Sequence, residues 1–498
     1  MAGVLWIAGG RGIGAGLQLL VLIVLARILS PADFGVLSAA LVVIGFSTIF
    51  AHFGFGPAVV QRKELETRHI DTAFTVSIIV GVAFGCLIAA TAPLAAKFFH
   101  MEDLVPVLRL LALVFPLQGV AVVADSLIRR DLRFRWLSRL DVIAYGVGYG
   151  VIGVSLAFSG LGVWSLVLAE LSRVLVRTAM LLMGQKRLAR PGWDAAAFHD
   201  LLHFGGGFTI ARLANFLAVQ GDNLVVGRAL GPVALGIYGR AYQLMAAPAA
   251  SFGDVLDTVL FPAMAKVQHD KSRLAPAYLR SVAVIAAVVL PPSVAIVALG
   301  PEIIRVALGP QWDAAVVPFQ LLAVGMLFRT SYKMSDSVSR ATGAVYRRAW
   351  RQVVYAVLVI CGALVGQRWG IPGVAIAVVV ALGANFMLMA HLSLSVTGLS
   401  WREFAAVHLP PAALAATCAP VVWGTAEALR SAEMPPMVVL TGASAATLTW
   451  AMLLVWRAPQ LFLGEHVVWL LATVRSHLPA RMQKHLVPPA PAPSMKTP

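Results

Sequence analysis

The sequence predicts an all-α, polytopic membrane protein, and three observations support this fold class. Hydrophobic residues make up 59% of the 498-residue chain, charged residues make up only 12%, and the mean hydropathy is +0.83. A soluble protein averages about 25% charged residues, because its surface faces water. Apolar stretches of about 20 residues, the length that a helix needs to cross the hydrocarbon core, recur along the chain. Backbone groups in lipid must be satisfied internally, so these stretches are expected to be helices.

We expect fourteen transmembrane helices: two sets of six, then two more. The first set covers residues 5–27, 34–56, 72–97, 104–126, 138–159 and 161–183. The second set covers residues 203–222, 234–260, 278–299, 313–334, 351–368 and 372–396. The final pair covers residues 403–424 and 435–456.

The distribution of Lys and Arg orients these spans. Basic residues cluster in alternate loops, within residues 62–68, 129–139 and 186–190 for example. The opposite ends hold only Arg27, Lys97, Arg109, Arg228, Arg305, Arg368 and Arg430. Cytoplasmic loops carry the excess of Lys and Arg, so both termini are expected in the cytoplasm. This placement, rather than a single basic face, assigns the net charge of +16 to topology and anionic phospholipids, and argues against nucleic acid.

Two short matches suggest an internal repeat. LARILSPADFG (Leu25–Gly35) aligns with VGRALGPVALG (Val226–Gly236) at an offset of 201, and ADSLIRR (Ala124–Arg130) aligns with SDSVSRA (Ser335–Ala341) at an offset of 211. Six spans restore the original orientation, so the halves would be parallel and related by an axis along the membrane normal. The alternative is duplicated loop chemistry without a duplicated fold.

The repeat gives four predicted segments. These are a six-helix bundle over residues 1–197, a parallel six-helix bundle over 198–400, two further helices over 401–456, and a cytoplasmic tail over 457–498. Residues 464–485 mix apolar and basic residues, which favours a helix lying on the inner membrane surface. The Pro-rich end after this helix is expected to be disordered.

Basic residues inside predicted spans are the candidate binding groups, because a charge at membrane depth usually faces a cavity or a partner. The offset of 201 carries Arg11 onto Arg212, so two guanidinium groups could converge on one anionic ligand. The other reading for both is that they reach the inner headgroups. Arg173 follows Glu170 by three residues, so an ion pair competes with a substrate contact. Arg177 is expected to reach the inner headgroups. Arg240 and Arg329 have no obvious partner on their own helices, so each is a candidate to line a transport pathway.

Acidic residues are sparser. Asp222 and Asp254 are candidates for a coupling-ion site, although solvation at a helix end is the alternative for both. Asp125 and Asp336 are equivalent in the repeat and are expected to pair with Arg129 and Arg340. Neither a nucleophile–base pair nor a metal-ligand spacing emerges, and the three cysteines lie far apart. We therefore expect neither an enzyme nor a resident cofactor or metal.

These motifs resemble those of the oligosaccharide flippases of the MOP exporter superfamily, in the polysaccharide-transporter (Wzx-like) branch. The resemblance covers about residues 1–425. Its most specific pieces are LARILSPADFG (Leu25–Gly35), RRDLRFRWLSR (Arg129–Arg139), GLGVWSLV (Gly160–Val167), RLANFLAVQGDNLVVGRALG (Arg212–Gly231) and the Phe261-Pro262 step. On this resemblance the residues of the seventh span become cavity candidates: Arg212, Asn215, Gln220, Asp222 and Asn223.

The resemblance implies an inner-membrane flippase with two helical bundles around a cationic cavity. The implied ligand is an undecaprenyl-pyrophosphate-linked oligosaccharide, moved from the cytoplasmic to the periplasmic leaflet for surface or exopolysaccharide synthesis, including lipopolysaccharide. A polysaccharide polymerase and export machinery would be partners. The main alternative is a cation-coupled small-molecule or drug exporter of the same superfamily, which would favour cavity carboxylates over arginines.

Overall fold

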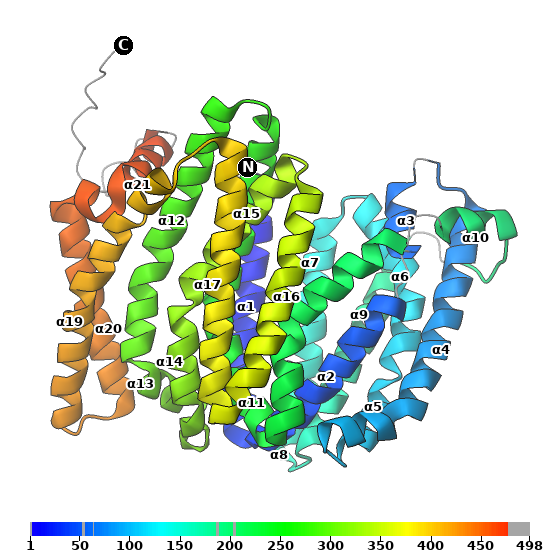
Figure 1. The fold of residues 1–498 in the computed structure, drawn as a ribbon. Coiled ribbons are helices and arrows are strands. Elements are labelled where there is room, and N and C mark those ends of the chain that lie inside the picture. Colours follow the sequence, from blue (N-terminus) through cyan, green and yellow to red (C-terminus); the bar gives the residue numbers. More distant parts are fainter. Residues whose placement is uncertain (1, 52–54, 63, 186–188, 203–205, 477–498) are drawn as a thin grey trace. The chain divides into compact units, whose positions relative to one another are not determined.

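The computed structural model describes residues 2–51, 55–62, 64–185, 189–202 and 206–476. Over these residues the chain is helical and contains no strand, so the all-α prediction is confirmed (Figure 1). Side chains are not described over parts of α1 and α11, which matters for two of the candidate arginines.

The elements follow one another in a single helical series. In the first half they are α1 (Ala2–Ile28), α2 (Pro31–Ala51), α3 (Phe55–Gln61), α4 (Thr67–Phe99), α5 (Leu104–Leu111), α6 (Val114–Arg130), α7 (Phe134–Tyr145), the π-helical η1 (Gly146–Gly153), α8 (Val154–Phe158), α9 (Val163–Met183) and α10 (Ala195–Leu202). In the second half they are α11 (Gly206–Lys266), α12 (Lys271–Ala298), α13 (Gly300–Ala307), η2 (Pro310–Ala315), α14 (Val316–Val324), α15 (Met326–Ala341), α16 (Val345–Gly366), η3 (Gln367–Trp369), α17 (Gly370–Thr397), α18 (Trp401–Ala406), α19 (Leu409–Ser431), α20 (Pro436–Arg457) and α21 (Pro459–Ser476).

The chain is a multi-pass membrane protein. Within the described residues, eight helical segments are long and apolar enough to cross a membrane, and a bent pair, Pro310–Val324 with Met326–Ala341, makes nine. α9 is not among them, because Glu170, Arg173 and Arg177 all fall within its length. The count of fourteen spans stays a prediction.

Two long helical stretches contain a sharp reversal at a glycine. α11 is interrupted at Gly231, whose φ of 83° lies in the region that favours glycine. α16 and α17 meet at Gly370, with a φ of 68°, and run side by side (Figure 1). A Cβ on Gly366 would lie 2.5 Å from the carbonyl oxygen of Gly373, so the hairpin closes through direct backbone contact.

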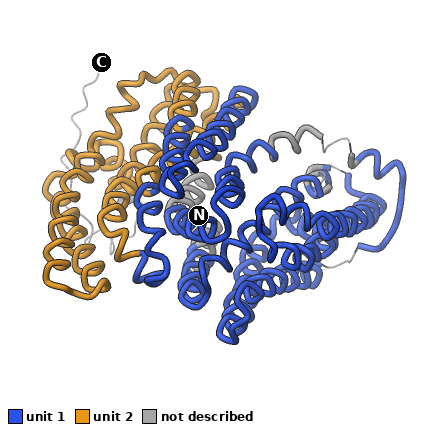
Figure 2. Tube along the Cα trace, turned by 60° about the horizontal axis from the view of Figure 1, so that its bottom comes forward, with its two compact units in different colours: residues 1–255, 304–322, 345–385 blue, residues 256–303, 323–344, 386–498 orange. Residues whose placement is uncertain are grey.

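The chain divides into two compact units. Unit 1 comprises residues 1–255, 304–322 and 345–385, and unit 2 comprises residues 256–303, 323–344 and 386–498 (Figure 2). This division follows packing density, so it leaves the predicted parallel repeat open.

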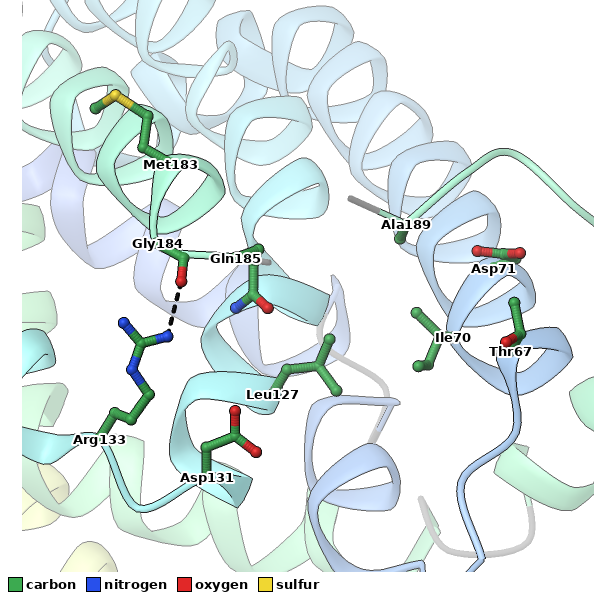
Figure 3. A pocket seen from close by; sticks show the side chains of 10 residues that line it. All are labelled: Thr67, Ile70, Asp71, Leu127, Asp131, Arg133, Met183, Gly184, Gln185 and Ala189. Carbon is green, nitrogen blue, oxygen red and sulfur yellow. Dashed lines mark hydrogen bonds between the residues drawn. The ribbon is translucent and has the colours of Figure 1, made fainter. Parts of the chain in front are cut away.

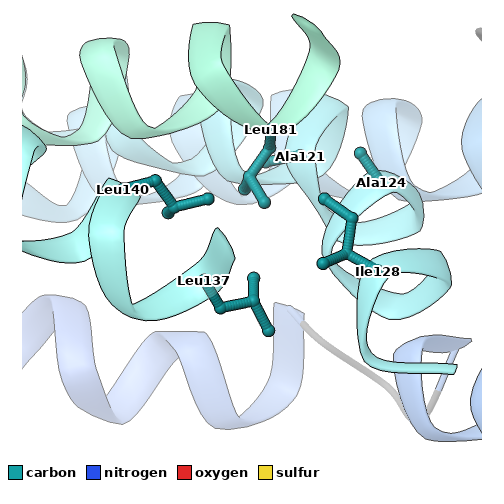
Figure 4. Packing of buried hydrophobic residues seen from close by; sticks show 6 residues of the cluster. All are labelled: Ala121, Ala124, Ile128, Leu137, Leu140 and Leu181. Carbon is teal, nitrogen blue, oxygen red and sulfur yellow. The ribbon is translucent and has the colours of Figure 1, made fainter. Parts of the chain in front are cut away.

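Within unit 1, α6, α7 and α9 share an apolar core and an ionic network. Figure 4 shows the apolar side chains meeting between the three helices: Ala121, Ala124, Ile128, Leu137, Leu140 and Leu181. Beside this core Arg177 of α9 donates to Asp125 of α6 at 2.9 Å and to Asp141 of α7 at 2.8 Å. The sequence did not predict these two ion pairs, because their carboxylates come from other helices; the expectation that Arg177 reaches the headgroups stays a prediction.

The two expected i,i+4 ion pairs are present. Arg129 lies 2.6 Å from Asp125, and Arg340 lies 3.1 Å from Asp336. Each pair is formed within one helix, α6 in unit 1 and α15 in unit 2.

Unit 1 also contains a reciprocal contact between the two aligned motifs. A Cβ on Gly35 would lie 1.8 Å from the carbonyl oxygen of Pro232, and a Cβ on Gly236 would lie 1.9 Å from that of Pro31. The alignment pairs Pro31 with Pro232 and Gly35 with Gly236, so equivalent residues contact each other in both directions. A two-fold axis between α2 and the second arm of α11 would produce this pattern.

A helix, α21, is present in unit 2 where the sequence predicts one; its position on the inner membrane surface stays a prediction. It begins at Pro459, five residues before the predicted start, and it bends at Gly464, with a φ of 78°. Phe462 packs with Leu414 and Cys418 of α19. The predicted end at residue 485 and the Pro-rich segment lie outside the described residues.

Candidate functional site

The candidate site is built around Arg240 in unit 1. Arg240 lies on the second arm of α11, nine residues after the break at Gly231, which places it about 13 Å along the helix. Arg240 is also six residues inside the predicted span 234–260, so it falls within the expected hydrocarbon layer. No described carboxylate pairs with this guanidinium, and its buried Nε has no hydrogen-bond partner.

Aromatic rings, rather than acids, hold the Arg240 guanidinium. Its central carbon lies 4.7 Å from the centre of the Phe34 ring of α2. Phe34 is itself fixed by Trp312 of η2, whose ring centre lies 5.5 Å away and whose indole Nε1 donates to the carbonyl oxygen of Ala26 at 2.8 Å. Tyr145 and Tyr149 lie nearby on α7 and η1. Such cation–π contacts stabilise a desolvated guanidinium without neutralising it.

The neighbouring polar group is a compensated cluster on α9 and η1. Arg173 Nε donates to Glu170 Oε2 at 2.7 Å, and Arg173 Nη2 donates to Glu170 Oε1 at 2.5 Å. The Tyr149 hydroxyl donates to Glu170 Oε2 at 3.0 Å. The ion-pair reading of Arg173 is therefore confirmed, and the cluster adds no net charge beside Arg240.

Glycines in the π-helical turn allow this cluster to form. A Cβ on Gly148 would lie 2.7 Å from the Cβ of Arg173, and one on Gly153 would lie 2.9 Å from the Cβ of Ala169. α9 thus packs directly against the backbone of η1, which brings Tyr149 to Glu170. π-helical turns are rare and often occur at functional sites.

The result is a local excess of one positive charge at membrane depth. Arg173 and Glu170 cancel, whereas among the described residues Arg240 has the ring of Phe34 beside it and no paired carboxylate. Such a site would attract a phosphate group, whose oxygens match the guanidinium fork. An unpaired organic cation would be repelled.

Asp222 lies inside the first arm of α11, not at its end. The helix continues to the break at Gly231, so the expected helix-end solvation was wrong; the apolar residues after Asn223 extend the span. Asp222 is 2% exposed, and its Oδ2 accepts a hydrogen bond of 2.6 Å from Tyr238, on the opposite arm. Its role in ion coupling stays a prediction.

The remaining candidate residues either lie away from Arg240 or have side chains that the structure does not describe. The side chains of Arg11, Arg212 and Asp254 lie outside the described residues, so their expected convergence has no structural account. Asn215 is exposed on the first arm of α11. Arg329 is half-buried on α15, in unit 2, and makes at least one polar or ring interaction.

A separate pocket opens at the predicted inner end of unit 1. Its volume is about 690 Å³, and Figure 3 shows Asp131 and Arg133 facing Thr67, Ile70 and Asp71 across it. Arg133 already donates to the carbonyl oxygen of Gly184 at 2.7 Å. Because two carboxylates outnumber this one engaged guanidinium, the pocket does not favour a pyrophosphate.

Sequence reasoning missed the aromatic half of the site. Tyr145 and Tyr149 stand four residues apart, a spacing that places both on one helical face, and their rings stack at 5.0 Å. That spacing was available in the sequence. The contact of Phe34 with Arg240 was not, because it joins residues more than 200 positions apart.

A family model described as "Polysaccharide biosynthesis protein" matches residues 24–317, a region that contains every residue of the Arg240 site. The chain belongs to this polysaccharide biosynthesis family. It is 25% identical over 413 residues to the lipopolysaccharide biosynthesis protein WzxC of Escherichia coli (strain K12), covering 81% of this chain and 83% of that protein. It is 30% identical over 311 residues to the succinoglycan biosynthesis transport protein ExoT of Rhizobium meliloti (strain 1021), covering 62% of each. The ExoT match therefore spans less than two thirds of that relative.

Solved structures show that this family member has the MOP superfamily fold. The lipid II flippase MurJ in an inward closed conformation aligns with a TM-score of 0.72 and 12% identity, covering 90% of this chain and 98% of MurJ. An inward-facing multidrug resistance MATE transporter of the MOP superfamily aligns with a TM-score of 0.60 and 16% identity, covering 78% and 94%. At these identities the likeness establishes the fold alone.

Proposed function

We propose that the protein is a flippase that moves an undecaprenyl-pyrophosphate-linked oligosaccharide from the cytoplasmic to the periplasmic leaflet of the bacterial inner membrane. Membership of the polysaccharide biosynthesis family supports the pathway, and the names of WzxC and ExoT support lipopolysaccharide or exopolysaccharide precursors as the substrate class. Both termini would lie in the cytoplasm, and a polysaccharide polymerase would receive the product.

The observation that carries the proposal is the unneutralised guanidinium of Arg240. A lipid-linked oligosaccharide must bring a pyrophosphate and polar sugars across a layer that excludes them, while its polyprenyl tail can stay in lipid. Arg240 offers charge-assisted donors within a predicted span of that layer. Phe34 contacts the guanidinium without accepting a hydrogen bond, so this contact does not occupy the donors of Arg240.

Movement would follow alternating access between two helical halves. Gly35 and Gly236 permit backbone contact between α2 and the second arm of α11, close to the ends that are predicted to face the periplasm. The described contact would close the outer end, leaving Arg240 to receive a ligand from the inner side. Translocation would require this contact to separate.

A cation-coupled drug exporter is the alternative, and the MATE-like fold is the observation that favours it. Such an exporter would bind organic cations, which need an uncompensated carboxylate or an aromatic cage without a positive charge. In the described part of unit 1, Glu170 is held by Arg173, Asp222 accepts a hydrogen bond from Tyr238, and the Phe34 ring already contacts Arg240. We therefore place the anionic lipid-linked sugar first.

Export of the polysaccharide made by the native pathway tests the proposal. Arg240→Gln is expected to reduce export at least tenfold at normal membrane abundance, because it removes charge-assisted hydrogen bonds worth about 1.5–3 kcal/mol. Lipid-linked oligosaccharide should accumulate in the cytoplasmic leaflet. Arg240→Lys keeps the charge but loses the fork, so export should fall less.

Arg368 provides a matched control, because it is an exposed arginine beside the α16–α17 turn. Arg368→Gln should leave export unchanged. Normal export by the Arg240→Gln variant would refute the assigned site. If the wild-type protein raised the resistance of a drug-sensitive strain to cationic drugs, and its loss left polysaccharide export unchanged, the exporter would be favoured.

A further inference from the structure

A second arginine with a partnerless buried Nε lies in unit 2, far along the chain from the Arg240 site. Arg280 is half-buried on α12, and its Nε has no hydrogen-bond partner. Its guanidinium carbon lies only 3.6 Å from the centre of the Trp469 ring of α21. Among the described residues, no carboxylate pairs with it.

The bend of α21 produces this stack. Phe462 fixes the first arm of α21 against α19. The backbone then turns at Gly464, where a Cβ would lie 3.2 Å from Cγ of Pro410. The second arm of α21 therefore packs against α12, which places the Trp469 ring over the guanidinium of Arg280.

The surroundings of Arg280 are those of a membrane surface. Arg280 lies nine residues after the start of α12 at Lys271, the end that is predicted to be cytoplasmic. On α21, Leu461, Trp469 and Leu471 are 62%, 47% and 51% exposed, so an apolar edge faces outward beside the guanidinium. Trp and apolar residues at this level mark the boundary between headgroups and acyl chains.

Nearby titratable groups do not neutralise Arg280. Burial, and then the charge of Arg280, lower the pKa of the His466 imidazole below its usual 6.5, so His466 is mainly neutral at pH 7. Glu465 is exposed on the outer side of α21. One positive charge therefore remains at the junction of α12 and α21.

We propose that Arg280, held against Trp469, binds the phosphodiester of an anionic phospholipid at the inner membrane surface. The guanidinium fork matches two phosphate oxygens, the neutral His466 can donate a further hydrogen bond, and the exposed leucines contact the acyl chains. The site is independent of substrate movement and would fasten α21 to the membrane. Basic pockets between helices on the cytoplasmic side are a known way to hold such headgroups.

Native mass spectrometry of the full-length protein can test this site with defined lipids. The probes are phosphatidylglycerol, phosphatidylcholine and inorganic phosphate, each added to the same detergent-solubilised protein. Wild-type protein should bind phosphatidylglycerol several-fold more tightly than phosphatidylcholine: both carry the phosphodiester, but the choline ammonium of phosphatidylcholine cancels its net charge and is repelled by Arg280. Equal binding of the two lipids would overturn the proposal without any variant.

The variants then locate the site. Arg280→Gln should lose about tenfold in phosphatidylglycerol affinity. Arg457→Gln is the matched control, because Arg457 is an exposed arginine whose guanidinium carbon lies 5.8 Å from the Trp456 ring in the same unit; its affinity should not change. Unchanged affinity in Arg280→Gln, or displacement of the lipid by millimolar inorganic phosphate, would contradict a phospholipid site.

Discussion

Gly236→Ala tests whether the reciprocal contact between α2 and the second arm of α11 closes the outer end of the pathway. The added Cβ would lie 1.9 Å from the carbonyl oxygen of Pro31, whereas real Cβ atoms essentially never approach closer than 3.0 Å. The two backbones must therefore separate by about 1.1 Å, the difference between these distances. Neither partner is a flexible side chain, so the shift cannot be absorbed locally.

Overpacking of this kind destabilises by about 1–3 kcal/mol. If only the closed state is destabilised, the ratio of separated to closed molecules rises about 5–150-fold. The intrinsic helix preference of Ala over Gly, about 1 kcal/mol, does not distinguish the two states. Gly424→Ala on α19 isolates that preference, because a Cβ there meets nothing within 4 Å. It should stabilise the protein slightly and leave transport unchanged.

A cysteine at Ser38 reports the separation, because Ser38 Oγ lies 3.8 Å from the Cβ position of Gly239, one turn further along both helices. In a background with Cys86 and Cys361 replaced by Ala, Ser38→Cys should react slowly with a membrane-impermeant maleimide added outside the cell. Combining it with Gly236→Ala should raise the rate by at least fivefold, and polysaccharide export should fall. An unchanged rate together with normal export would refute the reasoning.

Three further predictions concern charged contacts in unit 1. Glu170→Gln should lower the free energy of unfolding by about 1–3 kcal/mol, because Arg173 keeps its charge without a partner. The double variant Glu170→Gln with Arg173→Gln should recover part of this loss, as measured by thermal stability in detergent. Arg177→Gln should destabilise more than Arg129→Gln, since Arg177 joins three helices whereas Arg129 pairs within α6; equal melting temperatures would contradict this. Arg62 lowers the pKa of the Asp200 carboxyl below its usual 3.8, so the contribution of this pair to holding α10 is complete above that pH and is lost as the pH falls through the lowered value. Amide protection of α10 should therefore drop in that acid range, and Arg62→Gln should weaken the dependence, leaving the smaller part that His69 contributes.

The sequence anticipated what depends on local pattern. Apolar length and periodicity predicted the helices, and i,i+3 or i,i+4 spacing predicted Arg173 with Glu170 and Arg129 with Asp125. The ion pairs of Arg177 were not predicted because its two acids come from other helices. Asp222 was misplaced because a polar residue was taken for the end of a span. Contacts between distant segments have no local signal, so Phe34 could not be assigned to Arg240.

The contrast between Arg173 and Arg240 explains why an aromatic ring suits a ligand-binding arginine. A carboxylate like Glu170 occupies the donors of the guanidinium and cancels its charge, so an incoming phosphate would have to displace it. A ring face stabilises the cation by about 0.5–2 kcal/mol and leaves the donors free. Phe34→Leu removes the ring while keeping an apolar side chain, so it should weaken export several-fold. Phe34→Tyr preserves the ring and should retain export. If Phe34→Leu exported normally at wild-type abundance, the cation–π contact would be structural, and Arg240 would need another account of how it stays charged in the membrane.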